Sequence, residues 1–161
     1  MKDRRVVFLE QVMSRRKKLD RKLNDVLLVL RGEREALEQA VAESQSAADR
    51  QAEALAEQDR KVDEMIGGAF RPDEFLRLRE HQVDMASRHT MALQEVARAE
   101  AQVAGKQAEI DQGRARIVQN RAKIDIYDKR RDKLCKAIDM AIEDAQDEEA
   151  SENRRPAPRA F

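Results

Sequence analysis

The stretch Gly67-Gly68-Ala69-Phe70-Arg71-Pro72-Asp73 decides the fold, because it is the only place between Val6 and Gln146 where consecutive residues oppose a helix. Paired glycines tolerate positive φ, and a proline lacks an amide donor and disfavours helical backbone at the residue before it. The segments on either side are of nearly equal length. The sequence therefore predicts a helix, a tight turn and a second helix that folds back along the first.

The predicted bounds are a first helix over about residues 3–66, a turn at 67–72 and a second helix over about residues 73–148. Asp73 is the preferred N-cap of the second helix, and the alternative makes Pro72 its first residue with Arg71 as a poor cap. Residues 151–161 contain two prolines and little to bury, so we expect a disordered tail. The fold class is all-α: one domain over residues 1–150, a long antiparallel two-helix coiled-coil hairpin.

The composition is typical of long exposed helices, since 40% of the residues are charged and only 3% are aromatic. Apolar residues at three- and four-residue steps form a wide stripe early in the first helix, which includes Leu19 and Val26. Further along, this stripe thins to a half-polar seam that includes Gln58. The second helix keeps a seven-residue repeat through Val96, Val103, Ile110, Ile117, Ile124, Arg131 and Ile138.

Folding at the turn predicts that facing residues have numbers that sum to about 139. Gly32 then lies close to Gly105, with Gly113 a short distance beyond. A glycine within a helix costs about 1 kcal/mol relative to alanine. These glycines mark either tolerant surface positions or a bend or contact point.

The net charge of zero conceals a segregated pattern. Residues 1–22 and residues 113–136 each carry nine Lys and Arg against three acids, whereas residues 137–153 carry seven acids and no base. The predicted register brings the two basic segments together at the open end of the hairpin. Their mutual repulsion favours an acidic partner surface. The alternatives are a solvated charged face and partial neutralisation by residues 139–149, which overhang the N-terminus.

The residues offer no catalytic constellation, cofactor site or metal site, and we therefore expect a protein that is not an enzyme. His81 and His89 lie eight residues apart on a helix, out of line for a metal pair. Cys135 is the only cysteine and is expected to pack at the seam. Apolar runs are too short to enter a membrane, and basic segments without stacking aromatics argue against nucleic-acid binding.

Residues 26–40, Val-Leu-Leu-Val-Leu-Arg-Gly-Glu-Arg-Glu-Ala-Leu-Glu-Gln-Ala, resemble the opening of the YscO/FliJ family, the coiled-coil stalk proteins of type III secretion and flagellar export. The resemblance implies a cytoplasmic protein, peripheral to a membrane-bound secretion apparatus, whose open end inserts into a hexameric export ATPase. It also implies contacts of the hairpin with the export gate protein and, in some members, with secretion chaperones. The virulence-type branch of the family fits better than the flagellar branch.

Two sets of residues are candidate contacts. The basic candidates for the ATPase are Arg4, Arg5, Arg15, Arg16, Lys129, Arg130, Arg131 and Lys133. The candidates for docking at the closed end are Phe70, Phe75, Leu76, Arg79 and His81. Aromatic and Arg side chains commonly anchor interfaces, and at least one phenylalanine should stay exposed there. The alternative for these two rings is packing over the turn and the seam. The alternative for the whole chain is a structural tether or self-associating rod without an ATPase partner.

Overall fold

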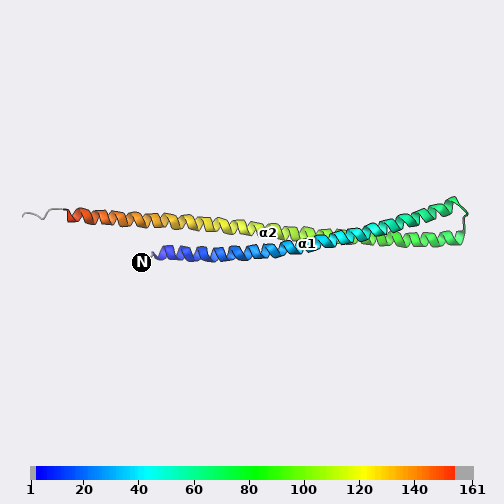
Figure 1. Ribbon diagram of the computed structural model, residues 1–161, viewed down its shortest axis with the longest axis horizontal. Helices are drawn as coiled ribbons and strands as arrows, with labels where there is room; N and C mark the ends of the chain where they lie inside the picture. The colour runs from blue at the N-terminus through cyan, green and yellow to red at the C-terminus, as the bar shows by residue number, and fades with distance from the viewer. Residues whose placement is uncertain (1–2, 155–161) are drawn as a thin grey trace, which may run out of the picture. The chain divides into compact units, whose positions relative to one another are not determined.

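The computed structural model describes residues 3–154, which form two helices and no strand. Helix α1 spans Arg4–Gly67 and helix α2 spans Pro72–Asn153, and they pack as an antiparallel hairpin (Figure 1). Asp3 caps α1, because its carboxylate accepts a hydrogen bond of 2.7 Å from the amide of Arg5 and its carbonyl accepts one of 3.1 Å from the amide of Val7. The predicted fold class is confirmed.

The second helix begins one residue earlier than the preferred prediction. The carbonyl of Arg71 accepts a hydrogen bond of 2.9 Å from the amide of Phe75, so Arg71 is the cap and Pro72 the first helical residue. The preference for Asp73 as the N-cap is wrong, and the alternative is correct. Proline suits this position because its φ is preset and its missing amide has no helical partner to lose. Asp73 and Glu74 then lie in the first turn, where negative charge stabilises a helix.

Of the paired glycines, Gly68 serves the turn through its small size, whereas a Cβ added to Gly67 would meet nothing within 4 Å. No described glycine has a positive φ, so the turn uses no left-handed backbone. A Cβ added to Gly68 would lie 3.1 Å from the carbonyl oxygen of Glu64, a tight contact with backbone that cannot easily move. Gly68 therefore lets the chain leave α1 close to the last helical turn.

Contacts between the helices divide the hairpin into two units, residues 3–25 with 114–154 and residues 26–113. In the first unit, Asn120 bonds to Arg16 and Arg121 bonds to Asp20. In the second, Lys106 pairs with Glu33. The numbers of these facing residues sum to values between 136 and 141. The predicted register near 139 is confirmed within each unit.

The core is a narrow seam built from seven-residue series on each helix. Ile110 is fully buried, and Gln58 is also buried, where its side-chain amide donates a 2.9 Å hydrogen bond to the carbonyl of Leu78. Leu19 and Val26, predicted within the seam stripe, are instead 39% and 55% exposed. Two helices cover only a narrow face of each other, so the outer residues of a wide stripe stay in solvent. The other buried apolar residues are Val6, Met13, Leu27, Ala48, Val62, Val96 and Ile117.

The three glycines in the helix interiors, Gly32, Gly105 and Gly113, differ in their surroundings. A Cβ on Gly32 or Gly105 would meet nothing within 4 Å, whereas one on Gly113 would lie 3.7 Å from Cδ1 of Leu27. Gly32 and Gly105 are thus tolerant surface positions. Gly113 lies at the seam, where an alanine would make an ordinary van der Waals contact.

Helix α2 extends to Asn153, beyond the predicted end near residue 148. Residues 151–153 were expected in the tail and are helical. No helix breaker occurs before Pro156, and the acidic run alone does not stop the helix. Residues 155–161, the rest of the expected tail, lie outside the described residues.

Candidate partner interface at the open end

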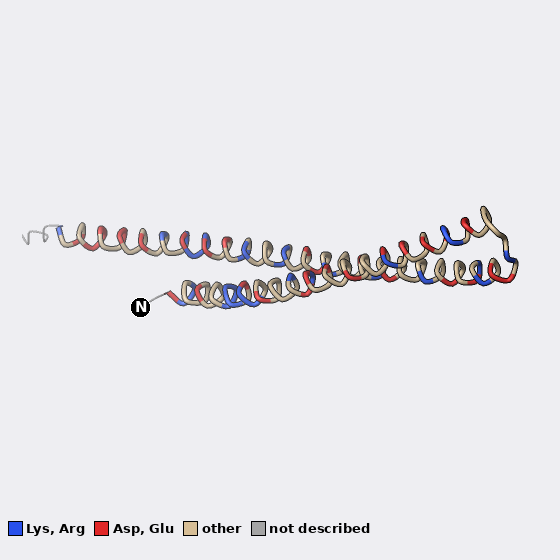
Figure 2. The backbone as a smooth tube through the Cα atoms, turned by 45° about the vertical axis from the view of Figure 1, so that its right-hand side comes forward, with Lys and Arg blue, Asp and Glu red and all other residues tan. Residues whose placement is uncertain are grey.

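The open end comprises residues 3–25, which are Asp3 and the first part of α1, and residues 114–136 of α2. These segments carry seventeen Lys and Arg against seven Asp and Glu. Figure 2 shows the basic residues on both helices toward the N-terminus of α1. The prediction that the hairpin gathers its two basic segments is therefore confirmed.

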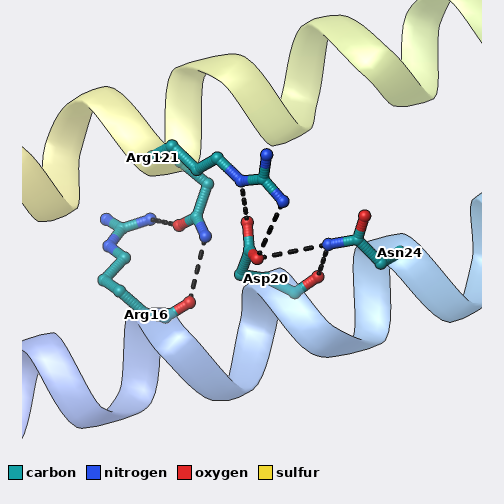
Figure 3. Close-up of polar contacts among 5 residues, drawn as sticks. Arg16, Asp20, Asn24 and Arg121 are labelled. Atoms are coloured by element: carbon teal, nitrogen blue, oxygen red, sulfur yellow. Dashed lines mark hydrogen bonds and ion pairs between the residues drawn. The ribbon is translucent and has the colours of Figure 1, made fainter.

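A buried polar layer fixes the register of this unit (Figure 3). Asn120 is only 4% exposed, and its side-chain amide donates a 3.0 Å hydrogen bond to the backbone carbonyl of Arg16. The Arg16 guanidinium in turn donates a 3.4 Å bond to the side-chain oxygen of Asn120. Sliding the helices by one residue would leave the Asn120 amide unpaired in a nearly closed seam, which is costly.

Asp20 supports the same layer from the neighbouring position. It accepts a 3.0 Å bond from Nε of Arg121, and the side chain of Asn24 donates a 2.8 Å bond to its carbonyl oxygen. The half-buried Asp20 thereby ties α2 to α1 and is itself held by the next turn of its own helix. These contacts give the surrounding cations a defined scaffold.

Five of the eight predicted ATPase contacts are exposed and make no ion pair or hydrogen bond with a described residue. They are Arg4, Arg15, Lys129, Arg130 and Lys133. The other three are engaged. Arg5 pairs with Asp3 at 2.9 Å, Arg131 pairs with Asp128 and Asp132 at 2.8 Å each, and Arg16 belongs to the Asn120 layer. The structure thus separates free cations from cations that already have a partner.

The pKa values reflect these pairs. Hydrogen bonds from Arg5 lower the pKa of Asp3 below its ordinary 3.8, and the same contact raises the pKa of Arg5. The hydrogen bond to Asp132 raises the pKa of Arg131, and the charge of Asp128 adds to this effect. Each of these cations is therefore held in its charged form.

A groove that the sequence did not predict lies among the free cations. Its floor holds Phe8, Leu9 and Leu134, and its lining includes Arg4, Arg5 and Arg130. Phe8 is 63% exposed, although it is one of only four phenylalanines in the chain. Its position between the seam residues Val6 and Leu9 turns it away from the seam, and this offset from the heptad was the available signal.

The closed end presents apolar surface beside the turn. Phe70 is 54% exposed, and its ring centroid lies 5.2 Å from that of the half-buried Phe75. The expectation that at least one phenylalanine stays exposed is confirmed for Phe70. Leu76 is 59% exposed. Arg79 donates a 2.5 Å bond to Gln82, and His81 is exposed beside Leu78 and Gln58 in a shallow groove.

Within residues 3–154, no three His, Cys, Asp or Glu side chains gather as they would around a metal ion. Neither α1 nor α2 has a stretch apolar enough to cross a membrane. Cys135 is a half-buried free thiol.

Residues 4–154 match the family described as bacterial type III secretion protein (HrpB7). The chain belongs to the HrpB7 family. The match covers both helices of the hairpin completely, together with the turn. It confirms that the resemblance to type III secretion proteins was correct at that level. No curated protein and no solved structure matches this HrpB7 chain.

Proposed function

We propose that this HrpB7 chain is a non-enzymatic stalk of a type III secretion apparatus, as in the YscO/FliJ family, and that its open end inserts into the hexameric export ATPase. The family match supports the secretion role. The observation that supports the ATPase contact is the set of free cations of the open end, of which Arg4 and Arg130 line the Phe8 groove. A surface with an exposed aromatic ring among arginines has the composition of a binding hot spot.

Electrostatics favours an acidic partner for this surface. Like charges at the density of the open end repel each other and cost stability in the isolated chain. An acidic lumen would remove that repulsion and would also accelerate association. The Asn120 layer supports the proposal further, since a rigid helical pair loses little conformational entropy on binding.

The closed end would meet a second component of the apparatus, the export gate protein or a secretion chaperone. Phe70 and Leu76 supply exposed apolar surface, and Arg79 and His81 lie on the following turns of α2. On this account the protein works in the cytoplasm, beside the membrane-bound apparatus, and needs no cofactor. Phe75 holds the Phe70 ring in place.

A structural tether or self-associating rod is the second candidate. It is favoured by α1 between residues 26 and 30, where Leu28 is 69% exposed and Val29 is 60% exposed. A helix that is apolar on several faces usually has more than one neighbour. Self-association through these residues would give the chain a role without an ATPase.

Co-purification from the native host separates the two candidates. A tagged chain should recover a hexameric ATPase, and the double variant Arg4→Glu with Arg130→Glu should lose it. The matched control is Lys61→Glu with Arg77→Glu, which reverses two exposed cations of the other unit. Recovery of the chain alone favours the rod. Equal loss of the ATPase in both double variants would refute a contact specific to the open end.

A further inference from the structure

Helix α2 continues well past the beginning of α1 (Figure 1). The facing residues of this unit have numbers that sum to between 136 and 141, so Arg4 lies opposite α2 near residues 132–137. Residues beyond 137 therefore have no α1 residue opposite them, and residues 137–153 are here called the overhang. All residues from 139 to 153 are exposed, and none forms a hydrogen bond or ion pair with α1.

The apolar seam does not stop where α1 stops. Ile138, Ala141 and Ala145 continue the two seven-residue series that face α1 in the paired part of the unit. Ile142 lies beside them and is 51% exposed. Residues spaced by three and four share one face of a helix, so beyond the half-buried Ile138 the overhang keeps a seam face that nothing in the described chain covers.

The charge of the overhang is opposite to that of the open end. Residues 137–153 carry seven Asp and Glu and no Lys or Arg. The alternative of partial neutralisation by residues 139–149 is not observed among the described residues, because the segment stays helical and exposed. A preformed helix thus offers an apolar seam flanked by carboxylates.

We infer that the overhang docks a basic amphipathic helix of another protein, which continues the coil along the seam beyond α1. The hairpin itself contains the precedent. Residues 4–25 of α1 carry eight Lys and Arg and cover the apolar seam of residues 114–136 of α2, with Val6, Leu9 and Met13 at the seam. The partner helix has this chemistry, with Lys and Arg facing the carboxylates of the overhang.

Charge decides against two other occupants. A second copy that paired overhang to overhang would bring fourteen carboxylates together, since each copy contributes seven. An anionic membrane would repel the segment for the same reason. The inference does not depend on the ATPase contact, because that contact requires the opposite charge and a different set of residues.

The test uses the full chain and a labelled synthetic helix of about three heptads with Leu at the a and d positions and Lys elsewhere. A peptide with Glu in place of Lys is the matched probe. The variant Ile138→Ser with Ile142→Ser removes seam contacts while leaving the charge unchanged. The matched control is Met140→Ser, on the opposite side of the same helix and 63% exposed. Circular dichroism checks that all the chains remain helical.

The basic peptide should bind the parent chain and Met140→Ser equally, and should lose about tenfold or more of its affinity for the double variant, since two apolar side chains are removed from the contact. The acidic peptide should not bind. Equal affinity of the basic peptide for the parent chain and the double variant would overturn the inference, because binding would then depend on charge and not on the apolar seam. The inference would also be overturned if the parent chain forms a dimer and the double variant does not, because the overhang would then bind a second copy of the chain.

Discussion

The two units of the hairpin share a heptad seam but treat their cations differently. In residues 26–113, six of eleven Lys and Arg form ion pairs, mostly with an acid three or four residues away, as in Arg60 with Glu57 and Arg88 with Asp84. The open end has sixteen Lys and Arg besides Arg114. Among these sixteen, only Arg5, Arg121 and Arg131 form ion pairs with described residues. One unit pairs most of its cations with its own acids, whereas the other leaves most of its cations without an ion pair.

The largest expected effect concerns the seam that the two units share. Ile110 is fully buried, so Ile110→Ala should lower the free energy of unfolding by about 2–5 kcal/mol through lost burial and a cavity. The control Val118→Ala, at a residue that is 67% exposed, should change it by no more than about 0.5 kcal/mol. Denaturant titration measures both. Similar values for the two variants would mean that burial at the seam does not hold the hairpin together.

The buried polar layers provide a matched comparison between the units. Asn120→Ala at the open end and Gln58→Ala in the other unit each remove an amide that bonds to a carbonyl of the facing helix. Each should cost about 1–3 kcal/mol of stability, because a buried group loses its partner. Asn120→Ala should also weaken ATPase binding, whereas Gln58→Ala should not. If ATPase binding falls in proportion to stability in both variants, the Asn120 layer does not position the cations.

The closed end should respond in binding more than in stability. Phe70→Ala with Phe75→Ala should remove the second partner while the melting temperature falls only slightly, since Phe70 is already 54% exposed. A pull-down and a thermal melt of the same sample give both values. A large fall in the melting temperature with equal loss of binding at both ends would show that the rings are structural. If neither the binding nor the melting temperature changes, the two rings have neither a docking role nor a structural role.

The smallest expected effects are on the pH dependence of stability, and they have opposite signs in the two units. Arg5 lowers the pKa of Asp3, so this contribution is present above pH 3.8 and is lost as the pH falls through the lower folded value. Glu33 and Glu109 raise the pKa of Lys106, so its contribution is present below pH 10.5 and is lost as the pH rises through the higher folded value.

Two single variants test these signs by denaturant titration across the pH range. Asp3→Asn should flatten only the acid limb of the stability profile, and Lys106→Met only the alkaline limb. Both groups lie near the surface, so added salt should reduce both effects. If the acid limb of the stability profile is unchanged in Asp3→Asn, other carboxylates cause the loss of stability at low pH.

The sequence predicted the features that depend on local pattern. Seven-residue spacing identified seam residues such as Ile110 and Ile117, and the one cluster of breakers located the turn within a residue or two. The choice between Asp73 and Pro72 failed because both residues satisfy the rules for a helix start, and only the Arg71 to Phe75 hydrogen bond decides. Pairs within one helix, such as Arg131 with Asp128, were also within reach of sequence spacing.

Features that depend on the facing helix were harder to predict. The bonds of Asn120 to Arg16 and of Arg121 to Asp20 require the register to within one residue, whereas the turn fixes it only approximately. The exposure of Phe8 and Val26 depends on how narrow a face one helix covers on the other. The gathering of the basic segments was therefore predicted from charge, but which of the cations are unpaired, and the groove beside Phe8, emerged only from the structure.

The central claim is that the free cations of the open end bind an acidic surface of the ATPase. The direct measurement is a binding titration of the full chain with the purified ATPase over a range of salt concentrations. Affinity should fall steadily as salt rises, since ions screen the attraction. Arg4→Glu with Arg130→Glu should abolish binding at every salt concentration, and Lys61→Glu with Arg77→Glu should match the parent. Affinity that ignores salt, or that survives reversal of Arg4 and Arg130, would contradict the account.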